Sequence, residues 1–177
     1  MTASHSEATV LYEERQAVAL ITLNRPQALN SFTRQMHHDL WAALDRASAN
    51  RHIRACVITG AGRGSWLLVE RLGLARAMAL AMTGDKLGAA QAKEWGLIWD
   101  VAEDPLADAL AMAAKLAEMP TQALVATRHL LRDAGTHSFT QHLDAERDAQ
   151  AALGRTHDYI EGVRAFLEKR APQFKGE

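Results

Sequence analysis

The first 60 residues alternate between hydrophobic and polar positions in short runs that are separated by turn-forming residues. This pattern is typical of β-strands, and the predicted strands are residues 9–14, 17–23 and 54–59. Before the third of these, apolar side chains recur every fourth residue from Phe32 to Ala49, which is typical of an amphipathic helix. Asn30 or Ser31 is positioned to cap the start of that helix. The predicted order is strand, strand, helix, strand.

The rest of the chain is predicted to be almost entirely helical, over residues 66–82, 89–95, 105–118, 120–133, 138–153 and 157–170. Gly96 fits the position just after a helix, and residues 97–101 fit one brief strand. Parallel strands are normally covered on both faces, and a sheet of three strands is small for such an arrangement. We therefore expect the later helices to pack on further strands or on a neighbouring subunit.

Composition narrows the function classes. A chain of 177 residues suits one compact domain, and a net charge of −1 argues against a nucleic-acid partner. Cys56 is the only cysteine, so we expect no internal disulfide and a buried strand thiol in a reducing cytoplasm. We find no leader pattern and no apolar run of ~20 residues, so we expect a cytoplasmic protein without a membrane partner.

Gly60, Gly62 and Gly64 follow the third strand and precede an apolar helix, which is the outline of a phosphate-binding loop. The dinucleotide pattern, however, requires a third glycine where Ser65 stands. It also requires an acidic residue at the end of a second strand about 20 residues on, where a helix is predicted to end. We favour a strand-ending turn. A dinucleotide-binding domain, which would bind NAD, stays open as an alternative.

The sequence on both sides of these glycines resembles a known family. "VALITLNRPQALNSF", the helix after it and "IRACVITGAGRG" resemble the N-terminal third of the crotonase superfamily, the enoyl-CoA hydratases and isomerases. "SWLLVERLGLARAMALAMTGDKLGAAQAKEWGLIWDV" resembles the segment just after the family's core. "DAERDAQAALGRTHDYIEGVRAFLEKRAPQFKG" resembles its C-terminal helices. Within the superfamily, the chain looks most like the ring-1,2-epoxyphenylacetyl-CoA isomerases of phenylacetate degradation.

The resemblance implies an α/β fold, a crotonase-like core of ββα spiral units that is incomplete here, followed by helices. The implied divisions are residues 1–64 and 65–104 for the two parts of the core and 105–177 for a helical region that forms oligomers and caps CoA. On the order of eighty family residues are absent at Gly64-Ser65, judged from the usual length of one domain. Either the printed sequence omits residues that the protein contains, or the protein itself lacks them.

The implied substrate is an acyl-CoA thioester whose carbonyl oxygen gains charge during reaction. In the family, two backbone N–H groups stabilise that charge and a carboxylate moves the proton. Those groups belong to the absent stretch, so no residue present is assigned a catalytic role. The favoured activity is 2-(1,2-epoxy-1,2-dihydrophenyl)acetyl-CoA isomerase. The alternatives are a general enoyl-CoA hydratase and a non-catalytic remnant that binds CoA or forms oligomers.

CoA contacts are implied at two places. Gln27, Ala28 and Leu29 match the family's first CoA-contacting loop, near the adenine and pantetheine. Phe166 and Lys169 match positions that reach the CoA nucleotide, often in a neighbouring subunit. Lys169 would pair with a phosphate and Phe166 would pack beside the adenine. The alternatives are a plain capped loop, a core phenylalanine and a solvated lysine.

CoA enters only as part of the substrate, and we expect no permanently bound cofactor. His142 and Glu146 share a helix face, but a zinc site needs a third protein ligand and none is obvious in the sequence, so no metal is expected. The family assembles as trimers that pair into hexamers, which implies a homotrimer or homohexamer.

Overall fold

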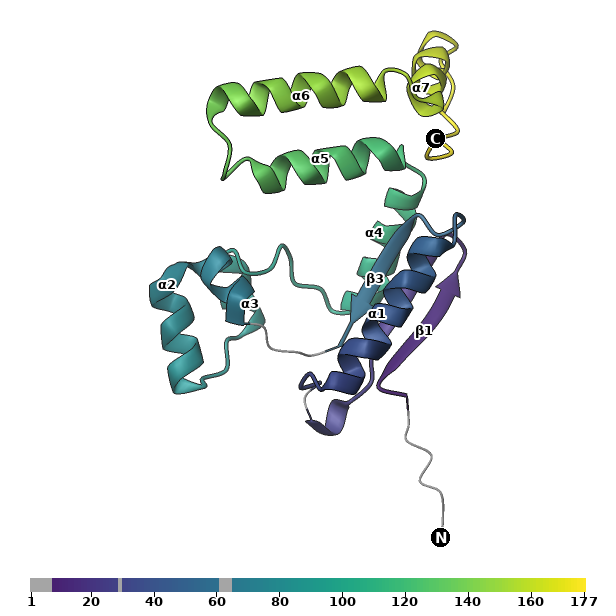
Figure 1. The fold of residues 1–177 in the computed structure, drawn as a ribbon. Coiled ribbons are helices and arrows are strands. Elements are labelled where there is room, and N and C mark those ends of the chain that lie inside the picture. Colours follow the sequence, from purple (N-terminus) through teal and green to yellow (C-terminus); the bar gives the residue numbers. More distant parts are fainter. Residues whose placement is uncertain (1–7, 29, 61–64) are drawn as a thin grey trace. The chain divides into compact units, whose positions relative to one another are not determined.

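The computed structural model describes residues 8–28, 30–60 and 65–177, which form one sheet and a series of helices (Figure 1). The elements are β1 (Val10–Arg15), β2 (Val18–Leu23), the 3-10 helix η1 (Pro26–Ala28), α1 (Arg34–Ala49), β3 (Ala55–Thr59), α2 (Ser65–Thr83), α3 (Ala89–Glu94), α4 (Pro105–Ala117), α5 (Thr121–Asp133), α6 (Phe139–Leu153) and α7 (His157–Leu167). None of these helices is long and apolar enough to cross a membrane.

The chain divides into two compact units, each described by itself below. The first unit holds the described residues of Met1–Glu13, Leu20–Arg46 and Ile58–Leu110. The second unit holds Glu14–Ala19, Ala47–Val57 and Ala111–Glu177. The sheet and α1 contribute residues to both.

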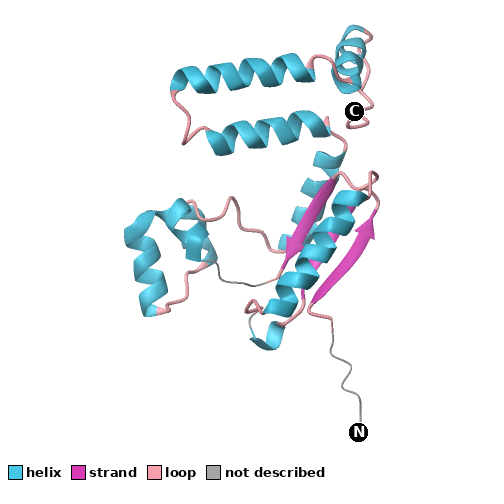
Figure 2. Ribbon diagram, in the orientation of Figure 1, coloured by secondary structure: helices cyan, strands magenta, loops and turns pink. Residues whose placement is uncertain are grey.

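The sheet has the order β1-β2-β3. β1 and β2 form an antiparallel hairpin, because the Asn24 N–H donates to the Thr9 carbonyl at 2.8 Å at the open end. β2 and β3 run parallel: the Arg54 N–H donates to the Ala17 carbonyl at 2.8 Å, and six residues further along both strands Gly60 lies against Leu23. A parallel pair needs a crossover connection, and α1 supplies it along one face of the sheet (Figure 2).

The core of the sheet lies at β2, where Val18, Ala19, Leu20, Ile21 and Leu23 are all buried. Ile21 of β2 and Met36 of α1 are fully buried, and burying each stabilises the fold by roughly 1.5–3 kcal/mol. The predicted amphipathic helix is therefore confirmed. Trp41, on the opposite side of α1, is 67% exposed.

The start of α1 differs from the prediction. The Thr33 hydroxyl accepts a hydrogen bond from the Met36 N–H at 3.2 Å, which is the geometry of an N-cap. Asn30 and Ser31 do not cap the helix, because both are used inside the preceding loop.

Two further predictions are wrong. Residues 97–101 do not form a strand: residues 97–99 are bends, and the described sheet ends at β3 and gives this segment no partner strand. Cys56 is exposed and not buried. In β3 the buried side chain is Val57, so its neighbour Cys56 points to the opposite face of the strand.

The predicted helices are otherwise present. Residues 66–82 correspond to α2, in which two helices meet at Gly73 with φ 73° and ψ 164°. Gly96 follows α3 with φ 75°, as predicted for a helix C-terminus. The last helix, α7, ends at Leu167, three residues before the predicted end.

Candidate functional site

The first candidate element is the loop between β2 and α1, in the first unit. Its backbone folds on itself: the Ala28 N–H donates to the Arg25 carbonyl at 3.0 Å, and the Ser31 N–H donates to the Ala28 carbonyl at 2.9 Å. Gln27 is exposed on η1 and Ala28 is half-buried. Leu29, the third predicted CoA contact, lies outside the described residues. The loop therefore presents the Gln27 side chain to solvent.

Asn30 fixes the shape of this loop. Its side chain is buried, and its Oδ1 accepts a hydrogen bond from the Arg25 N–H at 2.6 Å. Its backbone is left-handed, with φ 51°, a conformation that asparagine tolerates better than most residues. From the sequence, Asn30 is predicted only as a possible helix cap, and its role inside the loop has no local signal. The buried amide holds the loop in one conformation.

Gly60 supports the same loop, and this explains its presence. A Cβ at Gly60 would lie 2.7 Å from the Leu23 Cβ and 3.1 Å from the Asn30 Nδ2, and φ is 133°. Only glycine allows this approach without a shift of its neighbours. Gly62 and Gly64 lie outside the described residues. Close packing at the end of β3 accounts for Gly60 without a bound phosphate.

The second candidate element is the end of α7, in the second unit. Phe166 is 82% exposed, and Lys169 follows three residues later. The Lys169 N–H donates to the Phe166 carbonyl at 3.3 Å, and the Arg170 N–H donates to the Ala165 carbonyl at 3.0 Å. This pair of bonds is a Schellman motif, in which glycine usually occupies the position of Lys169. Lys169 has φ 55°, which costs a non-glycine residue roughly 1–2 kcal/mol.

Two carboxylates of α7 bind the C-terminal tail. Asp158 is 4% exposed, and its oxygens accept hydrogen bonds from the Lys175 and Gly176 N–H groups, each at 2.7 Å. Glu161 accepts two bonds from the Arg170 guanidinium, at 2.6 and 2.9 Å, and one from the Gln173 N–H at 2.9 Å. The tail is thereby held against α7 by charge-assisted hydrogen bonds.

These contacts change the acidity of Glu161. The Arg170 guanidinium, followed by the Gln173 N–H, lowers the pKa of the Glu161 carboxyl from its usual 4.5 to about 2. The Glu161 carboxylate, followed by that of Glu168, raises the pKa of Arg170. Both groups stay charged throughout the physiological range. The ion pair therefore fixes the tail whenever the protein is at neutral pH.

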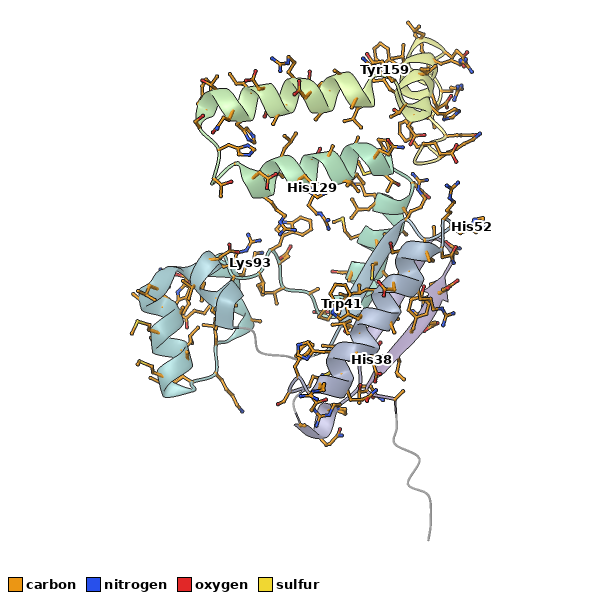
Figure 3. All side chains as sticks on the ribbon, in the orientation of Figure 1. His38, Trp41, His52, Lys93, His129 and Tyr159 are labelled. Carbon is orange, nitrogen blue, oxygen red and sulfur yellow. The ribbon has the colours of Figure 1, made fainter. Side chains whose placement is uncertain are left out.

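A pocket of about 710 Å³ opens within the second unit. Its walls come from the start of α5, the end of α6, α7 and the tail, and include Pro120, Leu153, Tyr159, Val163, Phe166 and Phe174. Tyr159 extends from α7 toward the end of α6 (Figure 3). Asp158 also borders the pocket, but tail N–H groups already occupy its oxygens. The pocket therefore suits an apolar or aromatic group.

Arg54 fixes the tail at a second point. Its Nε donates to the Thr121 hydroxyl at 2.9 Å, and its terminal nitrogens donate to the carbonyls of Phe174 at 2.9 Å and Met119 at 2.5 Å. The same guanidinium thus holds the start of α5 and the tail residue that lines the pocket. Nothing in the local sequence of Arg54 indicated this role.

Lys169 and Phe166 therefore lie together in the second unit, with Phe166 at the pocket wall, whereas Gln27 and Ala28 lie in the first unit. The described residues contain no group of three or more histidine, cysteine, aspartate or glutamate side chains that could hold a metal ion. The His142 Nε2 and Glu146 Oε1 atoms are 3.5 Å apart and form an ordinary i, i+4 pair.

Comparison with known proteins identifies the family. The sequence profile described as enoyl-CoA hydratase/isomerase matches residues 13–64 and again residues 61–177. The chain belongs to the enoyl-CoA hydratase/isomerase family. The resemblance to the crotonase superfamily is thereby confirmed.

Curated relatives support the same assignment. The 1,2-epoxyphenylacetyl-CoA isomerase of Escherichia coli K12 is 31% identical over 258 residues, which cover 95% of this chain and 98% of that protein. The 2,3-dehydroadipyl-CoA hydratase of the same strain is 35% identical over 122 residues, or 68% of this chain and 48% of that protein.

Solved structures establish the fold. An enoyl-CoA hydratase from Mycobacterium tuberculosis H37Rv matches with a TM-score of 0.84 at 22% identity, over 97% of this chain and 100% of that one. An enoyl-CoA hydratase/isomerase from Mycobacterium paratuberculosis matches with a TM-score of 0.85 at 20% identity, over 96% and 99%. The predicted crotonase-like α/β fold with C-terminal helices is confirmed.

The same comparisons locate a break in the enoyl-CoA hydratase/isomerase pattern. The two profile matches meet at residues 61–64, next to the predicted junction at Gly64-Ser65. The alignment with the E. coli isomerase spans 258 positions, at least 81 more than the 177 residues of this chain. The relative therefore has a stretch that this chain does not match.

Proposed function

We propose that the protein binds acyl-CoA thioesters and serves their isomerisation, with 2-(1,2-epoxy-1,2-dihydrophenyl)acetyl-CoA as its substrate. The resemblance to the E. coli 1,2-epoxyphenylacetyl-CoA isomerase along 95% of the chain supports this choice of substrate. The aromatic-lined pocket of the second unit, whose wall includes Phe166, is compatible with the adenine ring of CoA. A cytoplasmic location completes the proposal.

The observation that carries the proposal is the left-handed lysine at the end of α7. A strained backbone persists where the side chain serves a purpose, and glycine would remove the strain. Lys169 adds a cation three residues after the exposed ring of Phe166, a combination that fits a nucleotide phosphate and its base. In this proposal Lys169 pairs with a CoA phosphate and Phe166 packs on the adenine.

The loop between β2 and α1 supplies the remaining contacts. The Ala28 N–H and carbonyl are both engaged inside the loop, so Ala28 contributes apolar contact. In this proposal the exposed Gln27 side chain and Leu29 contact the adenine and pantetheine of a CoA molecule, which is not required to be the one that Phe166 contacts. Oxyanion stabilisation and proton transfer are assigned to the stretch that relatives have and this chain does not match. No residue of this chain is therefore proposed to be catalytic.

We also propose that the protein assembles as a homotrimer, or as a homohexamer made of two trimers. Large apolar side chains on α6 and α7 are exposed, among them Phe139 at 80% and Leu167 at 74%. Such side chains mark surfaces that another protein surface covers. A neighbouring subunit that covers α7 would also bring Phe166 and Lys169 to a second CoA molecule.

Substitution of Lys169 tests the CoA assignment. We expect Lys169→Ala to weaken phenylacetyl-CoA binding about ten-fold, or ~1.4 kcal/mol, through loss of a charge-assisted contact with phosphate. Lys115→Ala, which removes an exposed lysine from α4, is the matched control. Isothermal titration calorimetry measures both dissociation constants. Equal affinity in the two variants would contradict the assignment.

A non-catalytic CoA-binding remnant is the second candidate, and the long unmatched stretch of the E. coli relative favours it. The intact mass of the protein purified from its natural source separates the two. A mass of 19.4 kDa favours the remnant. A mass of about 28 kDa, scaled from a family-sized domain, favours the complete isomerase.

A further inference from the structure

Two apolar surfaces lie uncovered on either side of residues 61–64. The first is the outer face of β3, where Cys56 is exposed and Ile58 is 53% exposed. The second is the half of α2 after Gly73, where Leu74, Met78 and Met82 are 63%, 45% and 78% exposed. Both surfaces adjoin the point at which the family profile is interrupted.

The stripe on α2 has the spacing of a packing face. Leu74, Met78 and Met82 follow one another at intervals of four residues and so share one side of the helix. Ala77, by contrast, is 3% exposed. The small side chain is buried and the large apolar ones face solvent, which is the reverse of a helix with a solvated outer face. Methionine side chains also adapt readily to a partner surface.

β3 is an edge strand that lacks the usual protection. Edge strands in soluble proteins commonly carry charges that discourage pairing with another chain. β1, at the other edge of the sheet, carries Glu13, Glu14 and Arg15, whereas β3 has the sequence Ala-Cys-Val-Ile-Thr. β3 also runs parallel to β2, and parallel strands are normally flanked by further strands and covered on both faces. Its open edge is therefore suited to accept another strand.

We propose that the open edge of β3 and the apolar stripe of α2 dock a separate polypeptide that adds a strand beside β3. The partner we infer is a chain that carries the stretch present in relatives and unmatched here. The location supports this choice, because the profile breaks immediately after β3 and immediately before α2. A second copy of this chain has the same break, so it cannot supply that stretch. The inference rests on family membership and on an intact mass of 19.4 kDa, because a protein of about 28 kDa would itself carry the stretch. It does not rest on CoA binding.

Co-expression tests the docking surface directly. The central stretch of the E. coli 1,2-epoxyphenylacetyl-CoA isomerase that aligns with no residue of this chain is produced with an affinity tag in the same cells. We expect the tagged stretch to be recovered in soluble form with this chain at a ratio of one to one by native mass spectrometry. Cys56, the only cysteine, reports on the strand edge through its labelling by a maleimide. Partial desolvation by neighbouring atoms raises the pKa of this exposed thiol, so labelling is run at an alkaline pH of about 8.5, near the usual cysteine pKa.

A variant with a charge on the exposed face of β3 distinguishes this docking from nonspecific hydrophobic association. We expect Ile58→Lys to weaken recovery of the stretch at least ten-fold, because a lysine on an edge strand opposes pairing. Leu131→Lys on α5, where Leu131 is 73% exposed, is the matched control and should not change recovery. We also expect binding of the stretch to slow the labelling of Cys56 in the unsubstituted chain by at least ten-fold.

Several outcomes would overturn the inference. They are a stretch that stays insoluble or unbound when co-expressed, recovery that Ile58→Lys leaves unchanged, and a homodimer that already protects Cys56 without the stretch. None of these readouts involves CoA. If the stretch does not bind this chain, the CoA assignment is unaffected. If CoA does not bind, the result on docking of the stretch is unaffected.

Discussion

At the scale of single residues, Lys169 links the structure to the proposed function. A Schellman motif favours glycine at this position, yet the chain places a lysine there with φ 55°. The exposed Phe166 ring lies one helical turn before it. Because the backbone disfavours lysine and the proposed ligand favours it, stability and binding should respond to substitution in opposite directions.

The substitution Lys169→Gly separates the two effects. We expect the free energy of unfolding to rise by about 0.5–1 kcal/mol, since relief of the left-handed strain exceeds the entropy that glycine adds to the unfolded chain. Binding of phenylacetyl-CoA should weaken as in Lys169→Ala. Lys169→Ala is the control, because alanine keeps the strain and loses the charge. Urea denaturation of both variants measures the difference, and a less stable glycine variant would contradict this account.

At the scale of elements, Asp158 and Glu161 hold the C-terminal tail against α7. The bonds reach 9 to 18 residues along the chain, from α7 to Arg170 and on to Gly176. Arg54 adds a second attachment, to the Phe174 carbonyl. Phe174 lines the pocket, so the order of the tail and the shape of the pocket depend on the same contacts.

The ion pair of Glu161 predicts how stability depends on pH. Its pKa in the folded protein is lowered to about 2, so its stabilisation is fully present above pH 4.5 and is lost as the pH falls toward 2. We expect Glu161→Gln to flatten the pH dependence of unfolding across this window. Glu118→Gln, at an exposed position near the end of α4, is the control. The free energy of unfolding is measured from pH 5 to about 2. If it falls as steeply with pH in Glu161→Gln as in the unsubstituted chain, the role of Glu161 is contradicted.

The sequence predicted elements whose signal is local and missed features that depend on distant partners. α1 was predictable because Met36 repeats the helical period that buries it. Residues 97–101 look like a strand locally, but a strand also needs a neighbour, and the described sheet provides none. The roles of Asp158 and Arg54 were not predictable, since their partners lie 17 and 120 residues away in sequence.

For the candidate site, the sequence identified the side chains, and the structure shows the hydrogen bonds and backbone conformations that hold them. Gln27 and Lys169 came from matches to the family. The buried amide of Asn30 and the left-handed backbone of Lys169 appear only in the folded chain. A polar residue in a loop and a lysine at a helix end carry no signal of either role, because both are common at solvent-exposed positions.

At the scale of the whole molecule, both units expose large apolar side chains. Met82 and Leu74 do so in the first unit, and Phe139 and Phe166 in the second. Exposed apolar surface of this kind is costly in water unless another surface covers it. The first set adjoins the break in the family pattern, and the second lies on the helices proposed to contact neighbouring subunits. Our proposals therefore assign the two sets of side chains to two different partners.

The central claim is that this chain binds the CoA thioester of an aromatic acid. The most direct test is a calorimetric titration of the purified chain, its mass of 19.4 kDa confirmed, with phenylacetyl-CoA and separately with NAD⁺. We predict saturable binding of phenylacetyl-CoA with a dissociation constant below about 1 mM, corresponding to at least ~4 kcal/mol, and no binding of NAD⁺. Binding of NAD⁺ alone, or no heat from phenylacetyl-CoA at millimolar concentration, would contradict the account.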